Sequence, residues 1–311
     1  MEADKFLGIE IGGTKLQIVI GYADGTLLST HRFTVKKEDG ADGIRNNILR
    51  VLDEHKNERL TAAGIGFGGP VNWQTGRVEI SFHIEGWSGF SISEWLSDYL
   101  NIPVFVDNDA NVAALGEAVH GAGKDFNHVL YITIGSGIGG GMVINQQIYH
   151  GTMPGEVEIG HLRMDRNGAT LESLCSGWAV DEKIREAAVA NPSGILAKLV
   201  NGKTRSEAIF LKEAIQKGDE TATQIFEQTT EDFAFGLSHA IHLMHPELVV
   251  VGGGLSFMGD ILLQGIKAKL PAYLMKTFAP GPPIKLAALK EKAVPTGCLV
   301  LCSQKIQTSN N

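Results

Sequence analysis

The stretch LGIEIGGTKLQIVIG, residues 7–21, decides the fold, because two β-rich segments flank a Gly-Gly-Thr turn. Glycine lets a backbone turn sharply and approach a ligand closely, and consecutive exposed N–H groups in such a turn form a concavity that suits phosphate. A second stretch of the same kind, YITIGSGIGGGMVIN, occupies residues 131–145. Two such hairpins in one chain indicate two similar halves that hold one polyphosphate, and hence a nucleotide-dependent phosphotransferase.

The composition sets broad limits on what the protein does. The chain has 311 residues, of which 43% are hydrophobic and 20% charged, which fits two globular domains. Its net charge of −8 argues against a broad nucleic-acid surface, and three irregularly spaced cysteines argue against a disulfide framework. No apolar run is long enough to cross a bilayer, and residues 1–11 lack the regions of a signal peptide. We therefore expect a cytoplasmic protein that binds neither nucleic acid nor a membrane.

Strand-like and helix-like segments alternate through both halves of the chain, which predicts an α/β protein with mixed sheets. Strands are expected near residues 6–11, 15–22, 26–35, 62–71, 103–109, 131–145, 246–254 and 283–289. Helices are expected near residues 41–58, 92–100, 110–121, 178–190, 205–217, 219–245, 257–274 and 296–306. Ser91 and Glu94 have the spacing of a capping box. We expect an N-terminal lobe of residues 1–118, completed by 296–311, and a C-terminal lobe of residues 119–295.

The first hairpin supplies candidate phosphate ligands. The turn of Gly12, Gly13 and Thr14 can direct backbone N–H groups and a hydroxyl at a phosphate, and Lys15 adds positive charge. Glu10 precedes the turn, where a carboxylate can hold Mg²⁺, usually through water. The structural alternatives are an ordinary glycine-rich hairpin with a solvent-facing lysine, and a charged residue on a strand face.

The second hairpin fits the dinucleotide fingerprint G-x-G-x-x-G only formally. That fingerprint requires a helix after the turn, whereas the strand-like MVINQQIY follows here, so we interpret the turn as a second phosphate-binding hairpin. The predicted ATP contacts in this hairpin are Gly135, Ser136, Gly137, Gly139 and Gly140. Gly253 and Gly254 follow another buried strand and are predicted to pack against adenine; the alternative is a tight strand-to-helix connection.

Asp109 ends a predicted strand and opens a predicted helix. The partial positive charge of a helix N-terminus favours an ionised carboxylate, so Asp109 can accept a proton at neutral pH; the alternative is an aspartate that only caps the helix. The adjacent Asn108 has both donors and acceptors for a hydroxylated ligand. Glu158, His161 and Glu172 match the paired hydroxyls of a sugar. The alternatives for these three are a solvated acidic loop with one structural histidine, or a metal site.

Taken together, these motifs resemble the ROK family of sugar kinases and related repressors, which has the actin-like ATPase (ribonuclease H-like) fold. The matching pieces run in the family's order and span nearly the whole chain: IEIGGTK (9–15), GIGFGGPV (64–71), VDNDANVAALGE (106–117), ITIGSGIGGG (132–141), GEVEIGH (155–161), TLESLCSG (170–177) and VVVGGG (249–254). The resemblance implies a duplicated fold with two lobes around a central cleft, and phosphorylation of a hexose on its primary hydroxyl with ATP and Mg²⁺. It assigns proton acceptance and sugar contact to Asp109, phosphate binding to the two glycine turns, and sugar binding to Gly68, Gly69, Asn108, Glu158, His161 and Glu172.

Three departures from the family pattern bear on the site. Most members carry a cysteine-rich zinc motif after the Gly-His pair, but the segment from Arg163 to Thr170 contains no cysteine, so we expect no structural zinc. The first phosphate motif usually begins with aspartate, and the longer Glu10 keeps the charge but moves it further from the backbone. The asparagine that relatives have before the Gly-Trp pair, near the sugar, is His83 here, which leaves the identity of the sugar open.

Within this resemblance we expect a glucokinase-type reaction, with glucose ranked first and N-acetylglucosamine or N-acetylmannosamine second; fructose and allose are further alternatives. The expected donor is ATP, with polyphosphate as the alternative. Glu10 and the missing zinc motif keep a non-catalytic sugar sensor among the alternatives. Family repressors carry an N-terminal helix-turn-helix domain, and the first predicted strand begins near Phe6, so we do not expect one here. Relatives are often dimers, so the resemblance allows a homodimer, and the sequence itself leaves the oligomeric state open.

Overall fold

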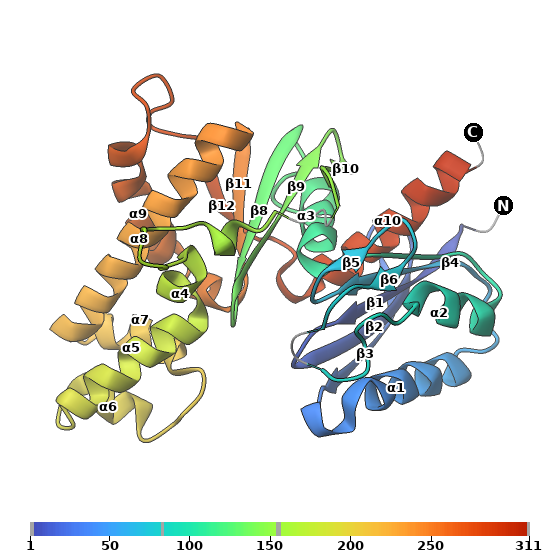
Figure 1. Cartoon of the computed structure of the whole chain (residues 1–311), viewed down its shortest axis with the longest axis horizontal. Helices are drawn as coiled ribbons and strands as arrows, with labels where there is room; N and C mark the ends of the chain where they lie inside the picture. The colour runs from blue at the N-terminus through green and yellow to red at the C-terminus, as the bar shows by residue number, and fades with distance from the viewer. Residues whose placement is uncertain (1–2, 82–83, 154–156, 310–311) are drawn as a thin grey trace. The chain divides into compact units, whose positions relative to one another are not determined.

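The computed structural model describes residues 3–81, 84–153 and 157–309. Contacts within the chain divide it into two compact units (Figure 1). The first unit comprises the described residues of Met1–Asn127, Gly141–Val157 and Ala288–Asn311, and the second unit those of His128–Gly140 and Glu158–Ala287. His83, which the sequence places near the sugar, lies outside the described residues.

The first unit is built on a five-stranded mixed sheet in the order β3-β2-β1-β4-β7. Strands β1, β2 and β3 pair antiparallel, and β4 and β7 continue the sheet parallel to β1. The strands are β1 (Lys5–Ile11), β2 (Lys15–Gly21), β3 (Leu27–Thr34), β4 (Leu60–Phe67) and β7 (Val104–Asn108), with the short pair β5 (Val71–Asn72) and β6 (Arg77–Val78) beside them. The meander expected over residues 6–35 is therefore confirmed.

Helices cover both faces of this sheet, as Figure 1 shows. The helices are α1 (Gly40–Glu54), α2 (Ile92–Leu100), α3 (Asp109–His120) and α10 (Ala293–Ser309), with the 3₁₀ turns η1 (Lys37–Asp39) and η6 (Lys290–Lys292). Because side chains alternate along a strand, Leu7 and Ile9 join the core under α1 and α2, while Phe6 packs with Leu299 of α10. Gly8 lies on the α10 side, where a Cβ would approach the Cys298 Cβ to 3.1 Å, so glycine lets the helix pack directly on the strand.

The second unit contains the parallel strands β8 (His128–Ile134), β11 (Leu248–Gly252) and β12 (Ile284–Leu286). They belong to a sheet of order β10-β9-β8-β11-β12, in which β9 (Ile138–Ile144) forms the second glycine hairpin with β8 and pairs with β10 (Gln147–Ile148). β11 is buried along its whole length, as expected for a parallel strand between neighbours. Both glycine hairpins expected from the sequence are thus present.

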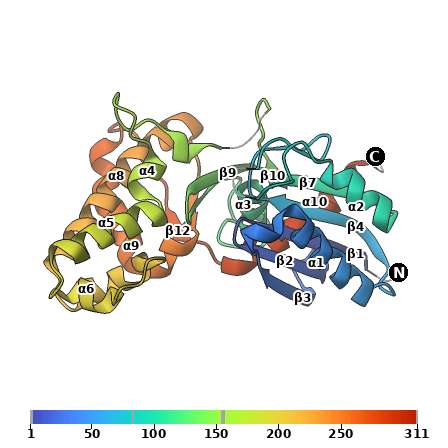
Figure 2. The same ribbon diagram turned by 60° about the horizontal axis from the view of Figure 1, so that its bottom comes forward.

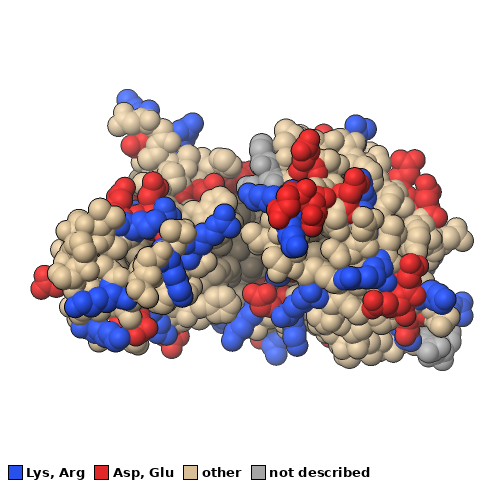
Figure 3. Space-filling model, turned by 90° about the horizontal axis from the view of Figure 1, so that it is seen from below, with Lys and Arg blue, Asp and Glu red and all other residues tan. Residues whose placement is uncertain are grey.

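The helices of the second unit gather beside one another in Figure 2, around the 25-residue helix α8. They are α4 (Leu171–Cys175), α5 (Gly177–Ala190), α6 (Ile195–Val200), α7 (Leu211–Gln216), α8 (Glu220–Met244) and α9 (Asp260–Lys269), with the 3₁₀ turns η2 (Ile159–His161), η3 (Glu207–Phe210), η4 (Gly254–Met258) and η5 (Leu270–Tyr273). Within the described chain, none of the helices has the length and apolar content that spanning a bilayer requires. Basic and acidic side chains are interspersed on the face drawn in Figure 3.

One expected helix cap is wrong and another was not foreseen. α2 begins after Ser91 as predicted, but the Ser91 side chain makes no capping hydrogen bond, because the Ser91 backbone (ψ 81°) belongs to a bridge with Arg77. A capping box forms instead at α4, where the Thr170 hydroxyl accepts from the Ser173 N–H and the Ser173 hydroxyl accepts from the Thr170 N–H. The α4 cap fixes the direction of the helix that carries Glu172.

A buried carboxylate holds the end of α3. Glu117 has no exposed surface, and its two oxygens accept hydrogen bonds from the N–H groups of Ala122 (2.8 Å), Ala288 (3.0 Å) and Leu289 (2.7 Å). Ala288 and Leu289 are the residues at which the chain returns to the first unit. Glu117 therefore ties that returning segment to α3.

Candidate active site

The Gly12–Thr14 turn lies at the edge of the sheet where the parallel strands β1 and β4 end. The Gly12 N–H donates to the Lys15 carbonyl (2.9 Å) and closes the turn, while the Gly68 N–H donates to the Ile11 carbonyl (2.8 Å). The loop that follows β4 is thereby fixed beside the turn. Thr14 at the tip is exposed, so its hydroxyl and the neighbouring N–H groups can reach a ligand.

Asp109 lies at the same edge, because β7 runs parallel to β4 and ends beside it. A Cβ on Gly68 would lie 3.2 Å from Oδ2 of Asp109 and 3.4 Å from the Gly12 Cα. The absence of a side chain at position 68 therefore lets the carboxylate and the first turn approach each other without a tight contact. Gly12, Gly68 and Asp109, which are far apart in the sequence, are brought together here.

Asn108, and not Asp109, caps α3. The Asn108 Oδ1 accepts hydrogen bonds from the N–H groups of Ala110 (2.8 Å) and Asn111 (3.4 Å), and its Nδ2 donates to the Gly69 carbonyl (3.3 Å). The alternative that Asp109 is only a cap is therefore wrong, because Asp109 is the first residue inside the helix. The amide of Asn108 joins the loop carrying Gly68 and Gly69 to the helix carrying Asp109.

The pKa of Asp109 is raised above its usual value, which corrects the expectation that the helix N-terminus would keep it low. Burial is the largest cause, and the Ala110 N–H and the positive charge of Lys15 oppose it without cancelling it. A carboxylate with a raised pKa is a better proton acceptor, because it binds a proton more strongly. The surroundings of Asp109 therefore favour proton uptake by its carboxylate.

The buried Glu10 and the partly exposed Lys15 form an ion pair below the first turn. The Lys15 Nζ lies 2.9 Å from the Glu10 Oε1 and 3.2 Å from the Glu291 Oε2. Burial raises the pKa of Glu10 to about 7, against the opposing effect of Lys15. Among the described residues, the buried Glu10 Oε2 has no hydrogen-bond partner, and neither has Oε1 of its cross-strand neighbour Gln17. Unsatisfied buried oxygens of this kind fit Mg²⁺ or a water that it holds.

Replacing Glu10 by glutamine is expected to change how stability depends on pH. The folded pKa of about 7 lies above the ordinary glutamate pKa of 4.5, so between these values the folded state keeps a proton that the unfolded chain has lost. The contribution of Glu10 to stability is therefore present below pH 4.5 and declines as the pH rises to 7, by at most about 3 kcal/mol. Urea unfolding from pH 4.5 to 8 in EDTA should show this decline in the unmodified protein and lose it in Glu10→Gln. The matched variant at the exposed Glu94, Glu94→Gln, should keep the decline; parallel curves for Glu10→Gln and the unmodified protein would contradict the assignment.

In the second unit, the turn of the β8–β9 hairpin is held at both ends. The Gly135 N–H donates to the Gly137 carbonyl (2.9 Å), and the Gly135 carbonyl accepts from the Gly177 N–H (2.7 Å) at the start of α5. A Cβ built on Gly135 meets no atom within 4 Å. The outer side of this turn is therefore open to a ligand.

The Gly252–Gly254 turn lies directly against this hairpin. Gly253 has φ +79°, and a Cβ there would fall 2.5–2.6 Å from backbone atoms of Ile134, so both its conformation and its neighbour require glycine. By contrast, a Cβ built on Gly254 meets no atom within 4 Å. The two predicted nucleotide-binding turns thus lie side by side at the carboxyl ends of the parallel strands β8 and β11, the edge at which such sheets bind ligands.

The predicted sugar ligands of the second unit gather around Ile138. The Glu172 Oε2 accepts from the Ile138 N–H (2.7 Å), and Gly160 of η2 packs against the Ile138 carbonyl. Glu158 and His161, at the two ends of this segment, are both exposed, with Oε2 and Nε2 3.9 Å apart. Glu172 therefore braces the hairpin, while Glu158 and His161 are accessible to a ligand.

The side chains of Asp165 and Arg163 hold the cysteine-free loop between Arg163 and Thr170. The Asp165 Oδ1 accepts from the N–H groups of Asn167 (2.8 Å), Gly168 (2.9 Å) and Ala169 (3.0 Å), and the Arg163 guanidinium donates to the Gly168 carbonyl (2.8 Å). These backbone donors lower the pKa of Asp165. No three His, Cys, Asp or Glu side chains in the described part of the chain are placed to hold a metal ion. The residues here do not fit a structural zinc, and Asp165 and Arg163 make the side-chain bonds that order the loop.

Sequence reasoning missed the partners of three residues at this site: Gly68, Asp107 and His150. The close approach at Gly68 involves residues that follow three separate strand ends. Asp107 stands in the recognised VDND stretch, but its bond to the His150 Nε2 (2.6 Å) joins residues that no local pattern connects. The only sign of this bond in the sequence was the acidic Asp107, which stands two residues before the predicted catalytic Asp109.

The structure has two mixed sheets, each with a glycine-rich hairpin turn, and a half-buried carboxylate lies beside the first turn. These features define the class of the actin-like ATPase fold. The sequence model of the ROK family matches residues 6–305, and the chain belongs to the ROK family. It is 29% identical to the glucokinase of Thermotoga maritima, over 97% of this chain and 98% of that protein. It is 30% identical to the N-acetyl-D-glucosamine kinase of Haemophilus influenzae, over 91% and 94%. The crystal structure of a ROK family glucokinase from Streptomyces griseus in complex with glucose and AMPPNP has a TM-score of 0.84 to this chain at 29% identity, covering 96% of this chain and 99% of that one.

Proposed function

We propose that this chain transfers the terminal phosphoryl group of ATP to the primary hydroxyl of a hexose, with glucose as the first substrate to test. Membership of the ROK family, the Thermotoga glucokinase and the Streptomyces glucokinase complex with glucose and AMPPNP support a sugar kinase. The observation that carries the proposal is the half-buried Asp109 carboxylate, with its raised pKa, beside Gly68 and the Gly12 turn.

Proton transfer to Asp109 starts the proposed reaction. The Asp109 carboxylate accepts the proton of the primary hydroxyl, the freed oxygen attacks the γ-phosphorus in line, and ADP leaves. Asn108, Gly68 and Gly69 of the first unit are the proposed sugar contacts beside Asp109, and Glu158, His161 and Glu172 are those of the second unit. Because phosphoryl transfer depends mainly on placing the reactants, these contacts supply much of the acceleration.

The proposed contacts to the phosphates of ATP come from residues of each unit. In the first unit these are Gly12, Gly13, Thr14 and Lys15, and in the second Gly135, Ser136, Gly137, Gly139, Gly140, Gly253 and Gly254. Mg²⁺, for which Glu10 is the proposed ligand through water, would neutralise charge on the phosphates. The Lys15–Glu10 ion pair keeps the lysine beside the first turn, where it adds to the attraction for phosphate.

A coupled assay of ADP release with a sugar panel tests this function. With ATP and Mg²⁺ we expect release that depends on the sugar, highest with glucose; the panel also contains N-acetylglucosamine, N-acetylmannosamine, fructose and allose. The Haemophilus relative makes N-acetylglucosamine the main competitor. Measurable sugar binding without ADP release from any sugar would favour a non-catalytic sensor and contradict the proposal. Polyphosphate in place of ATP tests the donor in the same assay.

Gly135→Ala is expected to weaken ATP binding without weakening the fold. The added methyl group meets no protein atom within 4 Å, so the free energy of unfolding should change by less than about 1 kcal/mol. The same methyl group occupies the space where a phosphate would approach the turn, so KM for ATP should rise about tenfold, equivalent to about 1.4 kcal/mol. Gly253→Ala is the contrasting variant, because its Cβ strikes Ile134 and should destabilise the protein. An unchanged KM for ATP in Gly135→Ala would remove this turn from the nucleotide site.

A further inference from the structure

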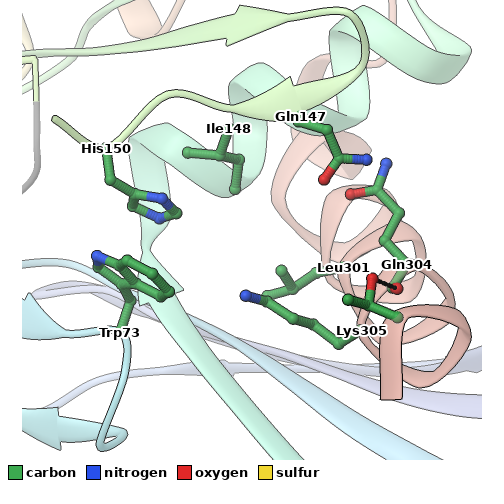
Figure 4. A pocket seen from close by; sticks show the side chains of 8 residues that line it. Trp73, Gln147, Ile148, His150, Leu301, Gln304 and Lys305 are labelled. Carbon is green, nitrogen blue, oxygen red and sulfur yellow. Dashed lines mark hydrogen bonds between the residues drawn. The ribbon is translucent and has the colours of Figure 1, made fainter. Parts of the chain in front are cut away.

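His150, just after β10, is joined to the buried carboxylate of Asp107. The His150 Nε2 donates to Oδ2 of Asp107 over 2.6 Å, and the two side chains are only 12% and 3% exposed. The indole of Trp73 stacks on the imidazole, with ring centroids 4.2 Å apart and planes inclined by 16° (Figure 4). His150 is therefore held on one side by stacking and at its Nε2 by an ion pair or a charge-assisted hydrogen bond.

The second oxygen of Asp107 leads to the proposed general base. The Asp107 Oδ1 accepts from the Asn108 N–H (2.8 Å) and from the Asn111 Nδ2 (3.0 Å). Asn108 in turn caps α3 through its own side chain, and Asp109 is the first residue of that helix. A continuous set of hydrogen bonds thus runs from the His150 imidazole to the start of the helix that carries Asp109.

A buried carboxylate needs partners for both oxygens, because an unpaired charged oxygen away from water costs several kcal/mol. At Asp107 the described partner of Oδ2 is His150, while the backbone and Asn111 serve Oδ1. Without His150, Asp107 would have to rotate towards water or another donor. Any such rotation breaks the bonds to Oδ1 and loosens the junction between β7 and α3, where Asp109 lies.

We propose that His150 is a positioning residue for phosphoryl transfer: through Asp107 it holds the start of α3 so that the Asp109 carboxylate meets the sugar hydroxyl. This inference rests on the proposed role of Asp109 as the general base. His150 acts through Asp107 and Asn108, so its loss affects the placement of the base and leaves the nucleotide turns of the second unit unchanged. The predicted signature is a fall in kcat with KM for ATP unchanged.

The space around His150 lets a substitution remove its hydrogen bond without disturbing the core. A pocket of about 280 Å³ opens beside the imidazole, bordered by Ile148 on one side and by Gln304 and Lys305 of α10 on the other (Figure 4). A substituted side chain at position 150 has room to settle there without displacing the core. Changes in kcat in His150 variants then report the loss of the bond to Asp107.

The experiment compares His150→Gln with His150→Leu, using whichever panel sugar gives the highest turnover. The glutamine amide can donate to the Asp107 Oδ2, whereas leucine has similar bulk and no donor. We expect His150→Leu to lower kcat about tenfold or more, since a misplacement of about 1 Å can cost a hundredfold. His150→Gln should recover most of that loss, and KM for ATP should stay within about twofold in both. Asp107→Asn combined with His150→Leu should cost little more than the larger single effect, because both changes remove the same interaction between the carboxylate and the imidazole.

Gln304→Leu is the matched control, because Gln304 borders the same pocket and bonds the exposed Gln146 carbonyl. Its kcat should equal that of the unmodified protein. An unchanged kcat in His150→Leu, or equal losses of kcat in the leucine and glutamine variants that follow their thermal stabilities, would overturn the inference. Asp109→Asn is assayed beside them: if it keeps its turnover, the role of the base fails, whereas an inactive Asp109→Asn with a fully active His150→Leu refutes the positioning role alone.

Discussion

Asp109→Asn is expected to lower kcat by at least about 10²–10⁴-fold, the range that general-base catalysis contributes. The asparagine amide has the shape of the carboxylate but cannot take up the proton of the sugar hydroxyl. Burial raises the pKa of Asp109, which makes its carboxylate a stronger base than one in water and enlarges the loss when it is removed. Asn108 supplies the helix cap in the structure, so α3 keeps its start in this variant.

The measurement pairs turnover with sugar binding. Steady-state kcat is followed by coupled ADP release, and the dissociation constant for sugar by titration calorimetry. Sugar affinity should remain within a few-fold, since the amide still forms hydrogen bonds with a hydroxyl. Asp98→Asn, at an exposed position on α2, is the matched control and should have full activity. Near-normal turnover in Asp109→Asn would show that another group accepts the proton.

Glu117→Leu is expected to lower the free energy of unfolding by about 3–5 kcal/mol. Glu117 is completely buried and satisfies three backbone N–H groups, and each donor left unpaired costs about 1–3 kcal/mol. Two of these donors belong to Ala288 and Leu289, so the variant also loosens the point at which the chain returns to the first unit. The loss should therefore exceed that of an ordinary surface substitution several-fold.

Glu117→Gln changes the hydrogen-bonding groups and keeps the size of the side chain. Glutamine keeps one acceptor oxygen and turns an NH₂ group towards an N–H donor, so its stability should lie between those of the unmodified protein and the leucine variant. Urea unfolding at pH 7 measures all three, with Glu182→Gln on the exposed side of α5 as the matched control. A loss below about 1 kcal/mol in Glu117→Leu would mean that water or other groups satisfy these donors.

The strands, the hairpins and the main helices could be predicted because their signals are local. Gly12 and Gly135 mark turns between β-rich runs, and the turns form where these runs end. The predicted helix that follows Asp109 ends at Gly121, as the sequence indicates. Periodicity and glycine placement act within a few residues, so one sequence is enough to read them.

The remaining features depend on contacts between segments that are distant in the sequence. The direction of the Asp109 pKa shift reflects burial by the folded chain, which outweighs the local effect of the helix N-terminus. Asn108 became the cap because the helix starts one residue earlier than expected. The bonds of Glu117 to Ala288 and Leu289, and of Asp107 to His150, join parts of the chain that meet only after folding. The amino-acid types of these residues do not indicate which partners they bind.

The most direct test of the central claim is to identify the product by phosphorus–proton correlated NMR. The protein is incubated with ATP, Mg²⁺ and glucose, and the phosphate ester is located on the sugar. We predict a new phosphomonoester coupled to the methylene protons of the primary alcohol, formed by the unmodified protein and not by Asp109→Asn. An ester on any other carbon, or no sugar phosphate from any hexose in the panel, would contradict the account.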